Sequence, residues 1–195
     1  MPIDESRPWG EVVDAVQDMV TFDRESTLSG VLSEAGPRNV RMGGGDFVDV
    51  TGGPSNLASR VRRYPCDVLH VAGGATPLFS IGTIELRKRR WRILGGFVIA
   101  TNIGRRGSEV YSSRAHPNDG KFEVIDALNG LTPRELLTLS RRLSTGGDIG
   151  HPRVRQRQAT NFLAPEPLHV FVDGVHRGRF TARIDIRADF LVVHV

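Results

Sequence analysis

The feature that most constrains the fold is a series of short apolar or alternating segments that begins at Asp67 and continues to the C-terminus. Turn-forming glycines such as Gly73-Gly74, and the basic segment 87–90, separate these segments, as is usual for successive antiparallel strands. We expect strands over 68–71, 78–86, 91–101, 122–127, 153–162, 168–172, 175–186 and 190–195. This succession predicts an antiparallel β-sandwich.

The N-terminal third of the chain follows a different pattern, in which short helices and strands alternate. A helix is expected over 24–35, with Asp23 as its N-cap. The apolar residues at three- and four-residue spacing on its expected buried face are Leu28, Val31, Leu32 and Ala35. The predicted fold class is therefore α+β and mainly β, with a short α/β piece over residues 1–65 and the sandwich lobe over residues 66–195.

One helix interrupts the strands, and its start is clearly marked. Thr132 is the expected N-cap, Pro133 occupies the first helical position, and Glu135 completes a capping box. The leucines expected on its buried face are Leu136, Leu139 and Leu143. The pair Gly146-Gly147 is expected to end the helix.

The length and composition fit one globular domain, or one domain with a small subdomain. The chain has 195 residues, of which 39% are hydrophobic and 25% charged, so it can bury a sizeable core. No apolar segment approaches the ~20 residues that span a bilayer, and the N-terminus lacks a signal-peptide pattern. We expect no integral membrane segment and a cytoplasmic location, with peripheral attachment to a membrane left open. The single Cys66 excludes an internal disulfide and a thiolate metal cluster.

The net charge of +4 comes almost entirely from arginine, since only two of the 26 basic residues are lysine. A basic surface favours anionic partners such as phospholipid head groups, nucleotides or nucleic acid. Arg153, Arg155 and Arg157 alternate along an expected strand, so they share one face and form a candidate anion-binding stripe. The basic segment 87–92 contains Trp91 and lies between two expected strands, where an arginine-rich tip is more often a solvated loop than a nucleic-acid site.

Two further segments carry a recognisable pattern: 115–124, which reads AHPNDGKFEV, and 171–175, which reads FVDGV. Together they resemble the C-terminal lobe of the diacylglycerol kinase, sphingosine kinase and YegS-like lipid kinase family, whose members read roughly A-x-P-x-D-G-x-L-x-V and, later, V-x-x-D-G-E. The resemblance implies a β-sandwich lobe and a structural Mg²⁺, held by the Asp119 carboxylate and the His116 and Lys121 carbonyls. Oxygen donors of this kind suit Mg²⁺. The alternative is that this segment is only a tight turn.

The resemblance breaks at Val175. In the family a glutamate follows the D-G pair and acts as the catalytic base, whereas Asp173-Gly174 is followed here by valine, which cannot accept a proton. His176 comes next, but neighbouring residues on a strand point to opposite faces, so it should not occupy the missing position. Asp173-Gly174 itself is expected to form a type I′ hairpin turn between two strands.

A glycine-rich loop follows a short strand expected over 39–42. The loop consists of Gly43, Gly44, Gly45, Asp46 and Phe47. It resembles the family's G-T-x-N-D-F-A-R-x-L-G loop at the junction between its two lobes, although Asp49 stands where the family has arginine. No G-G-D-G-T nucleotide loop precedes it, and the residues before Cys66 are too few for a complete ATP-binding lobe. No nucleotide is therefore expected as a cofactor.

Three functions remain open from the sequence. The leading hypothesis is a non-catalytic lipid-kinase-like domain that binds an anionic lipid, a small phosphorylated metabolite or a protein partner, because the catalytic glutamate and the nucleotide loop are missing. The first alternative is a lipid kinase whose ATP-binding lobe is supplied by a second polypeptide or by a homo-oligomer. The second is a nucleic-acid-binding module, which the lack of a helix-turn-helix, zinc or aromatic-platform motif disfavours.

Overall fold

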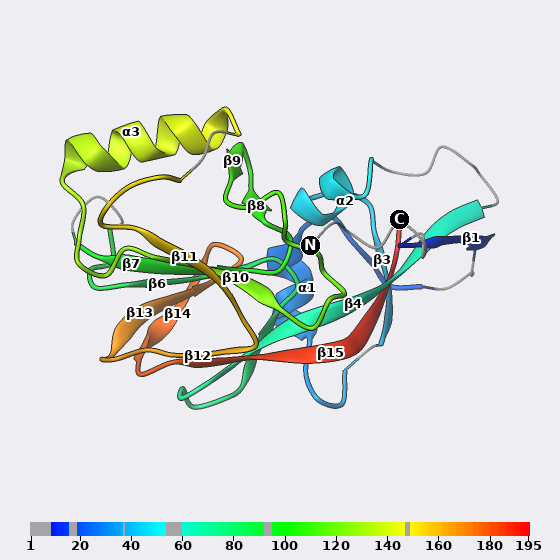
Figure 1. The fold of residues 1–195 in the computed structure, drawn as a ribbon. Helices are drawn as coiled ribbons and strands as arrows, with labels where there is room; N and C mark the ends of the chain where they lie inside the picture. Colours follow the sequence, from blue (N-terminus) through cyan, green and yellow to red (C-terminus); the bar gives the residue numbers. More distant parts are fainter. Residues whose placement is uncertain (1–8, 16–18, 37, 54–59, 92–94, 147–148) are drawn as a thin grey trace.

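Two β-sheets packed face to face form most of the computed structural model of the chain (Figure 1). The structure describes residues 9–15, 19–36, 38–53, 60–91, 95–146 and 149–195. Its helices are α1 (Glu25–Val31), α2 (Asp46–Val50) and α3 (Pro133–Ser144). Its strands are β1 (Glu11–Asp14), β2 (Thr21–Phe22), β3 (Asn39–Met42), β4 (Arg60–Ala72), β5 (Leu78–Ser80), β6 (Thr83–Arg87), β7 (Phe97–Thr101), β8 (Arg105–Arg106), β9 (Glu109–Val110), β10 (Phe122–Asp126), β11 (Arg155–Ala159), β12 (Asn161–Leu163), β13 (Leu168–Val172), β14 (Val175–Phe180) and β15 (Arg183–His194).

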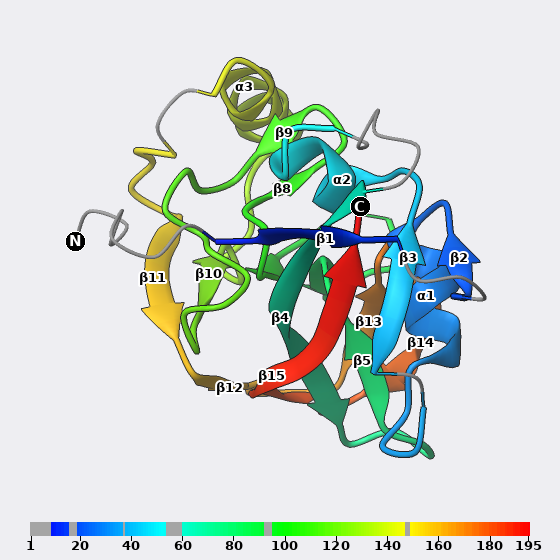
Figure 2. The same ribbon diagram turned by 90° about the vertical axis from the view of Figure 1, so that its right-hand side faces the viewer.

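The first sheet has the strand order β1-β4-β15-β3-β2, with β5 pairing to β4 and β12 pairing to β15. Its longest strands, β4 and β15, are antiparallel, with a register shift between Arg187 and Leu191. The end of β15 also pairs in parallel with β3, which pairs in parallel with β2. The N-terminal α/β segment and the sandwich therefore share one continuous sheet, in which β3, β15 and β4 lie side by side (Figure 2).

The second sheet has the order β11-β10-β7-β6-β13-β14, and all its neighbouring strands are antiparallel. The short β8–β9 pair stands apart from both large sheets and lies beside α3 (Figure 1). The predicted fold class, an α+β and mainly β sandwich, is confirmed. None of the helices in the described ranges is long and apolar enough to cross a bilayer.

Buried side chains form three clusters in the described residues. One fills the space between the sheets and draws on β4, β6, β7, β13 and β15. Another lies where α1 and α2 pack against β3, β4 and the end of β15. The last lies between α3 and the outer face of β7 and β10. On the other half of that outer face, the side chains from β6, β13 and β14 are polar or aromatic: Glu85, Arg87, His169, Phe171 and His176.

The expected start of α3 is confirmed in detail. Thr132 Oγ1 accepts a hydrogen bond from the Glu135 amide at 3.3 Å, and Glu135 Oε2 accepts one from the Thr132 amide at 2.8 Å. Leu139 and Leu143 are buried on the expected face. Cys66 is buried as well, and burial raises the pKa of its thiol well above the usual value.

The first helix is shorter than expected. It begins after Arg24, whose side chain makes no capping hydrogen bond, so the prediction of Asp23 as N-cap was wrong. It ends at Val31 because Leu32 adopts an extended backbone with a ψ of 132°. This change of direction buries Leu28 and Leu32 but leaves Val31 48% exposed, so the expected apolar residues do not share one buried face.

Three segments that we expected to be single strands are each observed as two strands, one in each of the two sheets. The range 78–86 divides into β5 and β6, the range 153–162 into β11 and β12, and the range 175–186 into β14 and β15. At each division the chain crosses from one sheet to the other while its apolar residues remain buried. Alternation does not reveal such a corner, because both sheets bury the face that points to the shared core.

Some expectations fall partly outside the described residues. The strand expected over 91–101 is observed as β7, from Phe97 to Thr101, and residues 92–94 are not described. Gly147, at the expected end of α3, also lies outside the described ranges. The boundary expected between residues 65 and 66 falls inside β4, and the division into two domains stays a prediction.

Candidate functional site

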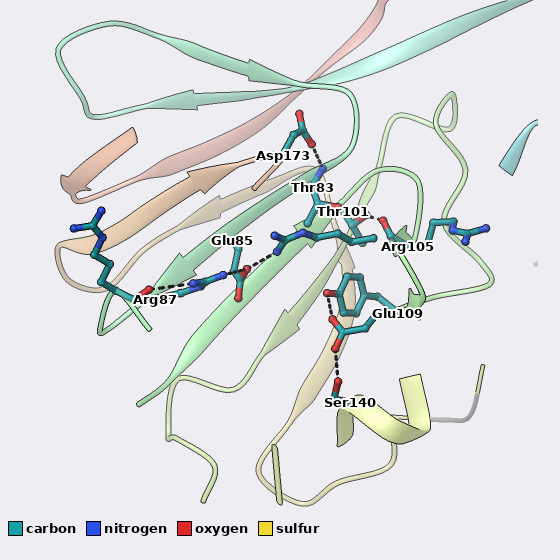
Figure 3. A network of polar contacts seen from close by, with 11 residues as sticks. Thr83, Glu85, Arg87, Thr101, Arg105, Glu109, Ser140 and Asp173 are labelled. Atoms are coloured by element: carbon teal, nitrogen blue, oxygen red, sulfur yellow. Dashed lines mark hydrogen bonds and ion pairs between the residues drawn. The ribbon is translucent and has the colours of Figure 1, made fainter. Parts of the chain in front are cut away.

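The turn between β13 and β14 places Asp173 at the junction between α1 and the sandwich. Asp173 has a φ of 46° and Gly174 a φ of 85°, as the expected type I′ turn requires. The Asp173 carboxylate accepts a hydrogen bond from the Ser29 hydroxyl of α1. It also accepts a bond from the Ser80 hydroxyl at 2.9 Å. A further bond comes from the Thr83 amide at 2.7 Å (Figure 3). Both carboxylate oxygens are therefore engaged by donors of the protein itself.

A second carboxylate, that of Glu25, lies against the glycine-rich loop. Glu25 is the first residue of α1 and is only 8% exposed. Its Oε1 atom accepts a hydrogen bond from the Phe47 amide, at the start of α2, over 2.7 Å. A Cβ atom added at Gly45, which has a φ of 99°, would lie 2.6 Å from Glu25 Oε2. The glycine at this position thus makes room for a carboxylate of the chain.

The remaining residues of the predicted loop lie at the same junction. Gly43 and Gly44 are close to Asp23, because a Cβ atom on either would come within 3.3 Å of its side chain or backbone. Asp46 Oδ1 accepts a hydrogen bond from the Gly107 amide, in the β8–β9 turn, at 2.8 Å. The loop is therefore held between α1 and the β8–β9 hairpin.

Three acidic side chains meet at this junction. Burial raises the pKa of Glu25, and the negative charges of Asp173 and Asp46 raise it further. Burial also raises the pKa of Asp173, while its hydrogen bonds and the charge of Arg106 act in the opposite direction. Arg105 lies 3.9 Å from the Asp46 carboxylate. The glycine-rich loop thus lies beside carboxylates of the chain itself, one of which is paired with Arg105.

Val175 follows the Asp173-Gly174 turn, where the sequence resemblance leads us to expect a glutamate. It opens β14, pairs with Val172 across the hairpin and is 40% exposed. His176 pairs instead with Phe171 and so points to the opposite face of the sheet. There its Nε2 atom lies 3.2 Å from His169 Nδ1. Residue 175 is thus not a proton acceptor, and His176 lies on the other face of the sheet.

The segment around Asp119 forms a tight turn. Asp119 Oδ1 accepts a hydrogen bond from the Lys121 amide at 3.0 Å. Gly120 has a φ of 70°, and its amide donates to Asp67 Oδ2 at 2.7 Å. Asp67 is 1% exposed and also accepts a bond from the Asp189 amide at 2.9 Å. Burial raises the pKa of both Asp67 and Asp119. Sequence reasoning missed Asp67, because its partners are distant in the chain.

The oxygen donors expected to bind Mg²⁺ belong to this one turn. They are the Asp119 carboxylate and the carbonyls of His116 and Lys121. The Lys121 amide engages Asp119 Oδ1, which leaves Oδ2 and the carbonyls as hard oxygen donors of the kind that Mg²⁺ prefers. In the part of the chain that the structure describes, no group of three or more His, Cys, Asp or Glu side chains is placed to hold a metal ion. A cation here would therefore depend on one carboxylate, backbone carbonyls and water.

The expected arginine stripe is only partly present. Arg153 precedes β11, and its guanidinium lies 3.4 Å from the Glu135 carboxylate at the start of α3. Arg155 and Arg157 lie on the edge strand β11 and are exposed. The Arg157 guanidinium lies 5.8 Å from the centre of the Phe162 ring. Two of the three arginines thus keep their charge available on one strand.

A buried ion-pair network on the outer face of the second sheet was not foreseen. Glu85 is 1% exposed and accepts hydrogen bonds from Arg87 at 2.6 Å and from Arg106 at 2.8 Å. Farther along this face, Glu109 accepts a bond from Ser140 of α3 at 2.6 Å (Figure 3). The Glu85–Arg106 and Glu109–Ser140 pairs are 21 and 31 residues apart, so no local sequence pattern signals them.

Comparison with known proteins supports the fold. No protein-family model and no curated protein matches the sequence. One similar solved structure is a diacylglycerol kinase from Bacillus anthracis str. Sterne, with 12% sequence identity and a TM-score of 0.57. The match covers 83% of the present chain and 68% of the diacylglycerol kinase chain. A second structure, of a provisionally assigned diacylglycerol kinase from the same strain, has 11% identity and a TM-score of 0.56. This match covers 83% of the present chain and 70% of the other protein's chain. The chain has a diacylglycerol kinase-like fold. At this identity the likeness concerns the fold, and the chemistry has to be argued from the residues.

Proposed function

We propose that the chain is a non-catalytic lipid-kinase-like domain that binds an anionic lipid, a small phosphorylated ligand or a protein partner. The observation that carries this proposal is the position of Glu25. Its carboxylate accepts a hydrogen bond from the Phe47 amide and fills the space beside Gly45. Without Glu25, the N–H groups of the glycine-rich loop would be open to a phosphate. An internal anion takes the place of that phosphate, and its charge repels a second anion.

The residues around Glu25 support the same conclusion. Asp46 Oδ1 accepts a hydrogen bond from the Gly107 amide, and Asp173 accepts three, so both carboxylates already have partners within the fold. Val175 cannot accept the proton of an attacking hydroxyl group. A kinase needs both a phosphate site and a proton acceptor, and these contacts support the proposal that the junction provides neither.

Nucleotide binding tests the role of Glu25 directly. We expect isothermal titration calorimetry of the full chain with MgATP to show no binding. In Glu25→Ala the carboxylate is gone and the Phe47 amide is released, so weak ATP binding should appear. Glu25→Gln, which keeps a hydrogen-bond acceptor without the charge, should fall between the two. Wild-type binding as tight as that of Glu25→Ala would contradict the proposed block.

Phosphotransfer is the second test. The purified chain is incubated with ATP, Mg²⁺ and either diacylglycerol or a sphingoid base, and we expect no phosphorylated lipid. Val175→Glu alone should gain no activity, because Glu25 still occupies the loop. An Asp46→Asn/Asp173→Asn variant prepared in the same way measures any contaminating kinase. Wild-type activity that this control lacks would overturn the proposal.

We also propose that the turn at Asp119 binds Mg²⁺ in a structural role. A bound ion should raise the free energy of unfolding by about 1.4 kcal/mol when its concentration exceeds Kd about tenfold. Thermal unfolding with Mg²⁺ and with a chelator measures the effect, and Asp119→Asn should remove it. An equal shift in wild type and variant would place the ion elsewhere.

A further inference from the structure

The connection between β6 and β7 carries an exposed tryptophan next to three basic residues. Trp91 is 72% exposed, the largest exposed fraction among the large hydrophobic side chains of the described ranges. Lys88, Arg89 and Arg90 precede it directly, and all three are exposed. We call residues 88–91 the basic tip. An exposed aromatic ring next to several positive charges is a combination that suits an anionic surface with an apolar interior.

The base of this connection is held in place. The Lys88 amide donates to the Gly96 carbonyl at 2.9 Å, which closes the hairpin. Arg87 bonds to Glu85 at 2.6 Å and to the Arg90 carbonyl at 3.0 Å. These contacts fix where the tip leaves the sheet while they leave its outer side chains in solvent.

The charges around the basic tip are mostly positive. Arg179 of β14 is exposed, and burial, His176, Arg179 and Arg90 together lower the pKa of His169, so both arginines act on the same outer face. Two acidic groups lie nearby and both are engaged. Glu85 is buried between two arginines, and Glu166 lies 3.1 Å from Lys88 Nζ. Arg89 and Arg90 make no ion pair with any residue in the described ranges, and the surface carries a net positive charge.

We propose that the basic tip docks this domain on the surface of an anionic phospholipid bilayer, with the Trp91 ring at the head-group level. Tryptophan is enriched at the membrane interface because its ring is apolar and its N–H is polar. Arginine and lysine next to it are attracted by the negative surface of such a bilayer. The proposal rests on the proposed function only in naming an anionic lipid, and it requires no phosphotransfer.

A nucleic acid would also attract these cations, but the tip fits it less well. Proteins that bind single strands combine a basic groove with several aromatic rings on which successive bases stack. The basic tip offers one such ring at the end of a hairpin. A bilayer needs only one interfacial ring and a cluster of cations, so it is the better match to the observed surface.

Vesicle binding tests the proposal with the full chain. The probes are vesicles of phosphatidylcholine alone or mixed with phosphatidylglycerol, followed by sedimentation and by tryptophan emission. We expect binding to the anionic vesicles only, with a blue shift of the emission that Trp91→Phe abolishes. Arg89→Gln/Arg90→Gln should weaken binding about thirtyfold, from the usual attraction of two basic residues to an anionic surface.

A matched variant controls for net charge. Arg155→Gln/Arg157→Gln removes two arginines from β11 and should keep most of the binding. Equal losses in the two double variants, or no vesicle binding by wild type, would overturn the proposal. So would binding to duplex DNA, in place of vesicles, that Arg89→Gln/Arg90→Gln abolishes. ATP binding or kinase activity would refute the proposed function and leave vesicle docking intact, whereas failed docking would leave the Glu25 argument intact.

Discussion

The junction around Asp173 and the basic tip are both rich in charged groups, but they differ in what those groups contact. At the junction Asp173 accepts three hydrogen bonds and Glu25 accepts the Phe47 amide. At the tip, Arg89 and Arg90 make no ion pair with a described residue, and Trp91 is 72% exposed. The family-like motifs thus lie where charged groups are bonded within the fold, whereas the basic tip, which we propose binds a bilayer, lies outside those motifs.

The largest expected loss of stability is at Asp173, in the junction. Asp173→Ala leaves three donors without their acceptor and puts alanine at a positive φ, which should cost about 3 kcal/mol or more. Asp173→Asn keeps one acceptor oxygen and tolerates this φ, so it should cost about 1 kcal/mol. Urea unfolding measures both. Similar losses in the two variants would show that the hydrogen bonds do not stabilise the junction.

A substitution at Gly45 should have the next largest effect. Gly45→Ala brings a methyl group against the Glu25 carboxylate at a φ of 99°, with an expected cost of about 2 kcal/mol. Gly53→Ala is the matched control, because Gly53 has a φ of 90° but open space around an added Cβ atom. The difference between the two free energies of unfolding isolates the contact with Glu25. No difference would mean that Glu25 does not fill the loop.

The pH dependence of stability should differ between wild type and a Glu25→Gln/Asp173→Asn variant. Burial raises the pKa of both groups, so the native state holds its protons to higher pH than the unfolded chain. The stability they contribute is present below the unfolded-state pKa values and is lost as pH rises through the native ones. Wild type should therefore lose stability relative to the variant from about pH 4 upward. A constant difference between their urea midpoints would contradict this.

The smallest effect is expected at the basic tip. Arg89→Gln/Arg90→Gln should change the free energy of unfolding by no more than about 0.5 kcal/mol, because exposed side chains without ion pairs contribute little to stability. Thermal unfolding next to the vesicle titration checks this. A large loss would show that the tip supports the fold, and the contrast with the junction would disappear.

Local chemistry accounts for the parts of the fold that the sequence predicts. The capping box at Thr132 and the turn at Asp173-Gly174 need only residues close in the chain, and both are present. The corners between sheets were missed, because both sheets bury their inner faces and the alternating pattern continues across the bend. The end of α1 at Val31 was missed for a similar reason, since apolar spacing does not register a change to extended backbone.

The sequence likewise determines only part of the candidate site. That residue 175 cannot accept a proton follows from its identity alone, and the sequence determines it without a structure. The sequence does not show that Glu25 lies against Gly45, that Asp67 supports the Asp119 turn or that Asp173 bonds to Ser29. The Glu25–Phe47 contact joins residues 22 apart and the Ser29–Asp173 contact residues 144 apart. Such contacts depend on how the sheets pack, so only the tertiary structure decides which charged groups are bonded within the fold and which are exposed to solvent.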